Sequence, residues 1–121
     1  MLGAIEMEVG VDCVEISRFS KQNASFFKKV FTDEEIEYCN NKGKPLQHFA
    51  VKFAGKEAVL KAMYSFGIPL DVSKIEILNS PSGSPYVKME QPLLDKHNIK
   101  ISLSHSETLA IAMAVVLRKN G

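Results

Sequence analysis

The stretch from Phe49 to Met63 constrains the fold more than any other part of the chain. Alanine, leucine, methionine, lysine and glutamate dominate it and no proline interrupts it, so it predicts a helix. On a helical wheel, large apolar residues form one stripe: Phe49, Phe53, Leu60 and Tyr64. Small residues suited to close packing form a second face: Ala50, Ala54 and Ala58.

Glu57 and Lys61 lie one helical turn apart between these two faces, where no solvent face is obvious. Burying a charge costs several kcal/mol unless it is paired or given a ligand. Alternatively, Glu57 and Lys61 form an ordinary ion pair on the helix surface, which stabilises a helix by about 0.2–0.5 kcal/mol. The sequence leaves both interpretations open, and the first makes the pair a candidate for function.

Composition indicates an ordinary globular protein. With 121 residues, 45% of them hydrophobic, we expect one domain spanning residues 1–121. A net charge of +1 gives no argument for binding nucleic acid or a membrane surface, although local lysine clusters fit either solubility or a phosphate or acidic partner. Cys13 and Cys39 have no metal-ligand spacing, and Glu6 and Glu8 interrupt any leading apolar run, so a reducing cytosolic compartment is expected.

The first third of the chain begins with a predicted strand. Apolar residues from Ile5 to Val11 alternate with Glu6, Glu8, Gly10 and Asp12, the period of a half-buried strand that ends at Asp12. Asp12 and Glu15 also have the spacing of a helix-capping box, so Asp12 is either a cap or a functional carboxylate. Phe26-Phe27 and Val30-Phe31 are interpreted as apolar anchors around a short turn.

The remaining elements predict an α+β fold. A capping box at 32–35 opens a helix that fades near 40–43, and the central helix is placed at 46–65, ended by Gly67 and Pro69. Strands near 75–77 and 87–89 flank the turn residues 79–85, and a short helix is expected at 91–97. Two strands follow, at 99–103 and 109–117. The last strand has large apolar residues on one side and alanines on the other, so we expect both of its faces to be covered.

Three polar features carry the candidate chemistry: Asp12, the Glu57–Lys61 pair, and Ser104-His105 at a strand end. Two carboxylates from different elements suit Mg²⁺, which leaves its other positions to water and phosphate oxygens. A lysine ammonium then neutralises phosphate charge. His105 alone could equally be structural.

Four segments follow one another along the chain: residues 10–19, GVDCVEISRF; residues 53–62, FAGKEAVLKA; Gly83-Ser-Pro85; and residues 101–106, ISLSHS. In this order they resemble the opening signature, the central helix, the hairpin and the Ser-His-Ser segment of one family, the holo-acyl-carrier-protein synthases, which are short single-unit 4′-phosphopantetheinyl transferases. The resemblance extends over essentially the whole chain.

The resemblance implies a long central helix on a mainly antiparallel sheet, and an enzyme that moves 4′-phosphopantetheine from coenzyme A to a serine of an apo acyl carrier protein. It implies a role in fatty acid biosynthesis. Asp12 and Glu57 would hold Mg²⁺, Glu57 directly or through water would take the serine proton, and Lys61 would stabilise phosphate charge, with adenosine 3′,5′-bisphosphate released. The other implied contacts to coenzyme A are Lys52, Lys56, Ser104 and His105. Those to the carrier are Arg18, Lys21 and Lys28.

The resemblance further implies a homotrimer with coenzyme A at subunit interfaces, where His105 completes a neighbour's site. The sequence departs from the family at Gly55, where alanine is usual, and at Lys52, where arginine is common. The rival hypothesis is a non-catalytic module of the same fold that binds the carrier or coenzyme A.

Overall fold

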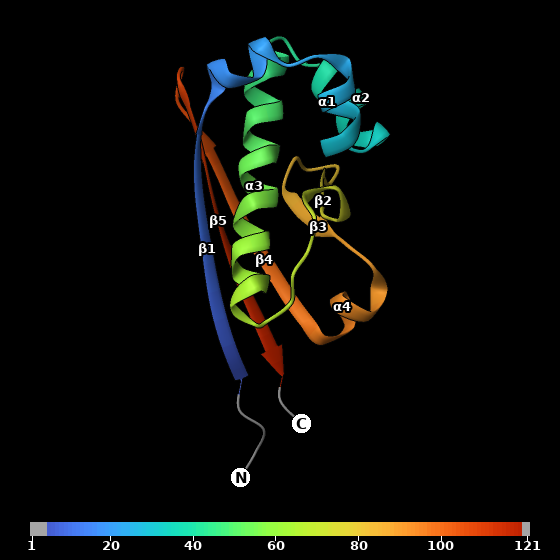
Figure 1. The fold of residues 1–121 in the computed structure, drawn as a ribbon, viewed down its shortest axis with the longest axis vertical. Coiled ribbons are helices and arrows are strands. Elements are labelled where there is room, and N and C mark those ends of the chain that lie inside the picture. The colour runs from blue at the N-terminus through green and yellow to red at the C-terminus, as the bar shows by residue number, and fades with distance from the viewer. Residues whose placement is uncertain (1–4, 120–121) are drawn as a thin grey trace.

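The computed structural model describes residues 5–119, so the first four and last two residues of the predicted domain lie outside the described part (Figure 1). Three antiparallel strands form the main sheet in the order β1-β5-β4: β1 (Ile5–Glu15), β5 (Leu109–Lys119) and β4 (His97–His105). A separate hairpin pairs β2 (Glu76–Asn79) with β3 (Pro85–Lys88). The helical elements are η1 (Ile16–Lys21), α1 (Ala24–Val30), α2 (Asp33–Asn40), α3 (Pro45–Ser65), η2 (Val72–Lys74) and α4 (Gln91–Lys96). This is the predicted α+β architecture, a long helix on an antiparallel sheet.

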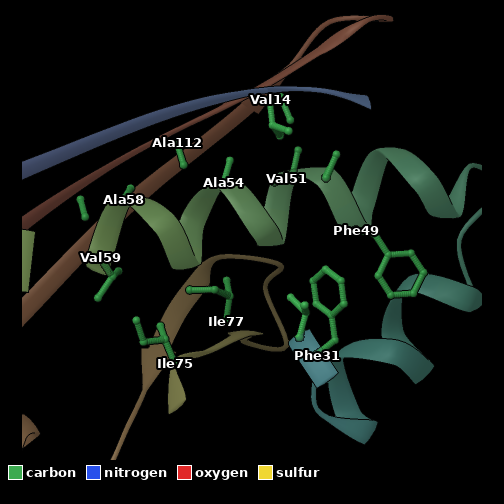
Figure 2. Close-up of a cluster of buried hydrophobic side chains, with 14 of the residues drawn as sticks. Val14, Phe31, Phe49, Val51, Ala54, Ala58, Val59, Ile75, Ile77 and Ala112 are labelled. Atoms are coloured by element: carbon green, nitrogen blue, oxygen red, sulfur yellow. The ribbon is translucent and has the colours of Figure 1, made fainter. Parts of the chain in front are cut away.

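Helix α3 lies between the sheet and the β2–β3 hairpin, as Figures 1 and 2 show. Its alanine face meets the alanines of β5, and small side chains on both elements let the helix and strand approach closely. On its other side Val59 points toward Ile75 and Ile77 of the second layer (Figure 2). The helix therefore buries residues on most of its circumference.

The burial of α3 differs from the expected one. The alanine face is completely buried, whereas the predicted apolar stripe becomes progressively exposed, from Phe49 at 4% to Tyr64 at 68%. The first half of the stripe is covered by η1 and α1, where Phe53 contacts Phe19 and Phe49 contacts Phe27, and only its carboxyl end is open. The charged pair thus lies next to a partly open side of the helix, which a wheel drawn from sequence cannot distinguish from a buried side.

The outer face of the sheet is apolar and exposed in the single chain. The prediction that β5 is covered on both faces holds only for its alanine side. Over residues 5–12 of β1 the inward residues are the polar ones and glycine, while the alternating apolar residues point outward, reversing the expected orientation; Val14, near the end of the strand, is buried in the core. The outward residues of β1 and β5 are between 37% and 62% exposed: Ile5, Met7, Val9, Val11, Leu109, Ile111 and Met113.

Local signals set the helix ends. The predicted capping box of α2 is confirmed, because Thr32 Oγ1 accepts from the Glu35 amide at 3.3 Å and Glu35 Oε1 accepts from the Thr32 amide at 2.9 Å. Gly67, with φ of +81°, follows the end of α3. The predicted turn around Phe26 and Phe27 is wrong, since these residues form α1, which is capped by Asn23.

Candidate active site

Asp12, Glu57 and Lys61 come together where β1 crosses α3. Lys61 Nζ donates to Asp12 Oδ1 at 3.1 Å and to the Val11 carbonyl at 2.9 Å. Asp12 lies inside β1, paired with Ala112 of β5, and the strand continues three residues past the predicted end. The alternative that Asp12 caps a helix is therefore wrong. The following η1 begins only after Glu15 and has no side-chain cap.

Gly10 lets β1 approach α3 closely enough to bring these groups together. A Cβ atom at Gly10 would lie 1.8 Å from the backbone oxygen of Ala58 and 3.0 Å from the Ala62 nitrogen. Only glycine fits that gap, because backbone atoms on the helix cannot move aside as a side chain can. The sequence placed Gly10 in a motif but gave no sign of this role.

The environment of Glu57 opposes its ionisation. Partial burial, and then the charge of Asp12, raise the pKa of Glu57, while the charges of Lys61 and Arg18 act to lower it. Within residues 5–119 no hydrogen bond engages the Glu57 carboxylate, and no cluster of three or more His, Cys, Asp or Glu side chains has the arrangement of a metal site. Two neighbouring carboxylates, one with both oxygens unbonded, fit a Mg²⁺ ion, which takes few protein ligands and fills the rest with water and phosphate oxygens.

Lys52 and Lys56 were expected to contact coenzyme A, but the structure gives both a role in the fold. Lys56 is fully buried, pairs with Glu35 Oε1 at 2.7 Å and donates to the Ile75 carbonyl. Lys52 is 3% exposed and donates to the Ile77 carbonyl at 2.5 Å and to Asn79 Oδ1 at 2.7 Å. Both ammonium groups tie α3 to the hairpin layer, and their contact with coenzyme A stays a prediction.

Ser104 and His105 lie at the far edge of the main sheet from Asp12, because β5 separates β4 from β1. Alternation along β4 turns them to opposite faces. The inward residues Ile99, Ile101 and Leu103 pack on the core, so His105 is on the α3 side and Ser104 on the outer side. The His105 ring lies 6.4 Å from that of His48 on α3. His48 was not among the predicted residues, and its contact with a residue 57 positions away had no local signal.

Comparison with known proteins identifies the family of the chain. A sequence model described as the 4′-phosphopantetheinyl transferase superfamily matches residues 8–114 of the chain. The chain belongs to this superfamily. It is 42% identical over 118 residues to the holo-[acyl-carrier-protein] synthase of Chloroherpeton thalassium, an alignment that covers 91% of this chain and 97% of the relative.

Solved structures of synthases share the fold of this transferase. The Helicobacter pylori holo-[acyl-carrier-protein] synthase, solved in complex with coenzyme A, aligns with a TM-score of 0.77 at 31% identity, covering 89% of this chain and 98% of that one. The Bacillus anthracis synthase, in complex with CoA (3′,5′-ADP), aligns at 0.81 and 26% identity, covering 95% and 99%. The predicted family, the predicted fold and the assignment of the chain as a phosphopantetheinyl transferase are confirmed.

The three predicted carrier contacts of the transferase are exposed near the start of α3. Arg18 and Lys21 lie on η1 and Lys28 on α1, which Figure 1 shows grouped at that end of the molecule. Arg18 lies 5.9 Å from the centre of the Phe53 ring, and its charge reaches Glu57. Arg18 is therefore placed between a basic outer surface and the carboxylates.

None of the helices within residues 5–119 is both long and apolar enough to cross a bilayer.

Proposed function

We propose that this chain transfers 4′-phosphopantetheine from coenzyme A to a serine hydroxyl of an apo acyl carrier protein, with Mg²⁺, and releases adenosine 3′,5′-bisphosphate. The observation that carries the proposal is the meeting of Asp12, Glu57 and Lys61 across β1 and α3 in a member of this superfamily. We place the reaction in the cytosol, where the two cysteines, free in this structure, stay reduced.

Phosphoryl transfer requires positioning and charge neutralisation more than a protein nucleophile. Asp12 and Glu57 would hold Mg²⁺, which when bound supplies positive charge to the pyrophosphate oxygens. Glu57, directly or through a water, accepts the serine proton. The serine oxygen forms a bond to the pantetheine-linked phosphorus, and the bond from that phosphorus to the bridging oxygen breaks. The bisphosphate leaves with that electron pair, and Lys61 stabilises the charge.

The direct test is to incubate the protein with coenzyme A, Mg²⁺ and several apo carrier proteins and then to weigh each carrier. We expect one carrier to gain the mass of phosphopantetheine with wild-type protein and none to gain it with Glu57→Gln. Glu37→Gln, an exposed carboxylate on α2, is the matched control and should leave the rate unchanged. If no carrier gains mass with wild type while coenzyme A still binds, the rival binding-module hypothesis replaces this one.

We further propose that three copies assemble through the apolar outer face of the sheet, with coenzyme A between neighbours. Two features support this. The face exposes a continuous set of large apolar side chains, which monomeric proteins rarely leave open. The predicted site residues also divide between two edges of the sheet, Asp12 on β1 and His105 on β4, so that one edge of each copy could face the other edge of the next.

Light scattering should give a mass of three chains, each 13.4 kDa. Co-expression of Glu57→Gln with His105→Ala tests the sharing of sites. Each variant keeps the wild-type residue that the other lacks. If copies assort at random, about a quarter of the interfaces pair a wild-type Glu57 from one copy with a wild-type His105 from its neighbour. Activity should therefore reappear when the two impaired variants are mixed. A monomeric mass, or no recovery in the mixed assembly, would contradict the shared site.

A further inference from the structure

A group of basic side chains surrounds Tyr38 where α2, α3 and β4 meet, away from Asp12 and Glu57. We call it the basic cluster: Lys42, His48, Lys52 and His105. Its members come from the turn after α2, from the first half of α3 and from the end of β4. Tyr38, on α2, contacts three of its members, Lys42, His48 and Lys52.

The distances within the basic cluster are short. Lys42 Nζ and Lys52 Nζ each lie 4.5 Å from the centre of the Tyr38 ring, on which they make cation–π contacts. The His48 ring is 6.1 Å from that of Tyr38 and 6.4 Å from that of His105. His105 Nδ1 donates to the Ser106 carbonyl at 3.2 Å, which leaves Nε2 as the remaining polar atom of its ring. The two histidines and Lys42 thus gather in one place from three segments.

Among residues 5–119, the charged groups that act on His48 are all cationic. Burial lowers the pKa of His48, and the charges of Lys42, His105 and Lys52 lower it further. Tyr38 is the neutral group that faces it from α2. The amino end of α3 adds to this field, because its cap residue, Lys44, makes no side-chain bond to the first amides. Lys52 is held by Ile77 and Asn79, so the groups free to meet a ligand are Lys42, His48 and His105.

We propose that His48 takes up a proton when a phosphate group of coenzyme A binds beside it, between Lys42 and His105. This inference rests on the proposed function, and it adds His48 and a proton linkage to the binding of that substrate. A phosphate placed among these groups offsets the repulsion that keeps His48 neutral. The bound state then favours the imidazolium, which donates from both ring nitrogens.

The pKa of free His48 lies below its usual value, so the ring is mainly neutral at pH 7. An anion within contact distance raises that pKa by about one unit or more. Affinity for coenzyme A should therefore rise as the pH falls from the bound pKa to the free one, and proton uptake should be greatest between the two values.

Proton NMR of the imidazole signals measures this on the wild-type protein. The chain has three histidines. His97 is buried at the opposite end of β4, bonded to the Leu93 carbonyl at 2.8 Å, and provides an internal reference. His48→Phe, which preserves an aromatic ring against Tyr38, identifies the His48 signal by its loss. Titrations are run with and without saturating coenzyme A.

We expect coenzyme A to move the pKa of His48 upward by about one unit and to leave the His97 signal unmoved. Isothermal titration at pH 8 and at pH 5.5 measures how much the affinity for coenzyme A rises as the pH falls. This rise should be up to about tenfold greater for wild type than for His48→Phe. Comparing the two proteins removes the contribution of the ligand's own phosphates, which titrate in the same way in both experiments. If coenzyme A binds and the His48 pKa stays in place, the inference is overturned while the transferase proposal stands. If coenzyme A does not bind wild-type protein at all, both are overturned.

Discussion

The buried ion pair between Glu35 and Lys56 offers the sharpest test of how this chain uses its lysines. Both side chains are fully buried, and Nζ lies 2.7 Å from Oε1. Lys56→Met keeps the length and volume of the side chain and removes its charge. The substitution therefore separates a lysine that holds the fold together from one that binds substrate.

The expected loss of stability is large. Removing one partner of a buried pair leaves an uncompensated charge and costs about 3–5 kcal/mol. The Glu35 carboxylate would keep two backbone donors, the amides of Thr32 and Ile77, at 2.9 and 2.8 Å, while the Ile75 carbonyl would lose its ammonium donor. The double variant Glu35→Gln with Lys56→Met removes both charges. It should therefore cost less than the sum of the single variants, by about 2–3 kcal/mol.

Urea unfolding followed by circular dichroism, at one fixed protein concentration, measures these free energies. Carrier labelling by folded protein measures the KM for coenzyme A. Because Lys56 contacts no open surface, KM should change by less than about twofold. A lysine that bound a phosphate would be worth about 1.5–3 kcal/mol, or more than tenfold in KM. A stable Lys56→Met variant with a greatly raised KM would refute the structural role.

Three further substitutions test the site. Gly10→Ala should cost about 1–3 kcal/mol and lower kcat, because its Cβ would overlap the backbone oxygen of Ala58, whereas Gly43→Ala, which meets nothing within 4 Å, should do neither. Without metal, wild type should lose stability relative to Glu57→Gln as the pH rises from about 4.5 through the raised pKa of Glu57, because ionised Glu57 destabilises the folded state. Parallel urea titrations of the two proteins measure this difference. A loss of stability by Glu57→Gln relative to wild type over that range would contradict the prediction. Arg18→Glu should raise the KM for the carrier, and high salt should raise the wild-type KM similarly; kinetics insensitive to salt would count against a carrier contact.

The parts of the fold that were predicted correctly depend on neighbours in sequence. The Thr32–Glu35 capping box lies within four residues, and its two hydrogen bonds are present. Helix α3 begins at Pro45, one residue before its predicted start, and ends at Ser65 as predicted. These signals act through the backbone of one segment and need no knowledge of the rest of the chain.

The contacts that the sequence did not reveal join residues that are far apart along the chain. Glu35 completes a capping box and also accepts from Lys56, 21 residues away. The sequence shows the first role and gives no sign of the second, which only the fold reveals. His48 meets His105 only because the end of β4 lies beside the first turns of α3. The pairing of two segments so far apart along the chain leaves no periodic trace in either of them.

The orientation of β1 is the most informative error. Alternation correctly predicted a strand, and the usual expectation turns its apolar side toward the core. Here Gly10 and Asp12 face α3, while Val9 and Val11 point outward. If β1 had its apolar side inward, Asp12 would lie away from Glu57. The orientation that brings the two carboxylates together therefore also leaves the apolar side of β1 exposed.

If three copies cover that surface, assembly stabilises an orientation of β1 that the single chain does not favour by burial alone. On this argument, outward charges that prevent assembly, such as Val9→Glu, should lower activity even though Val9 lies outside the predicted site. Activity that survives in a monomeric Val9→Glu protein would show that the orientation of β1 does not need the assembly.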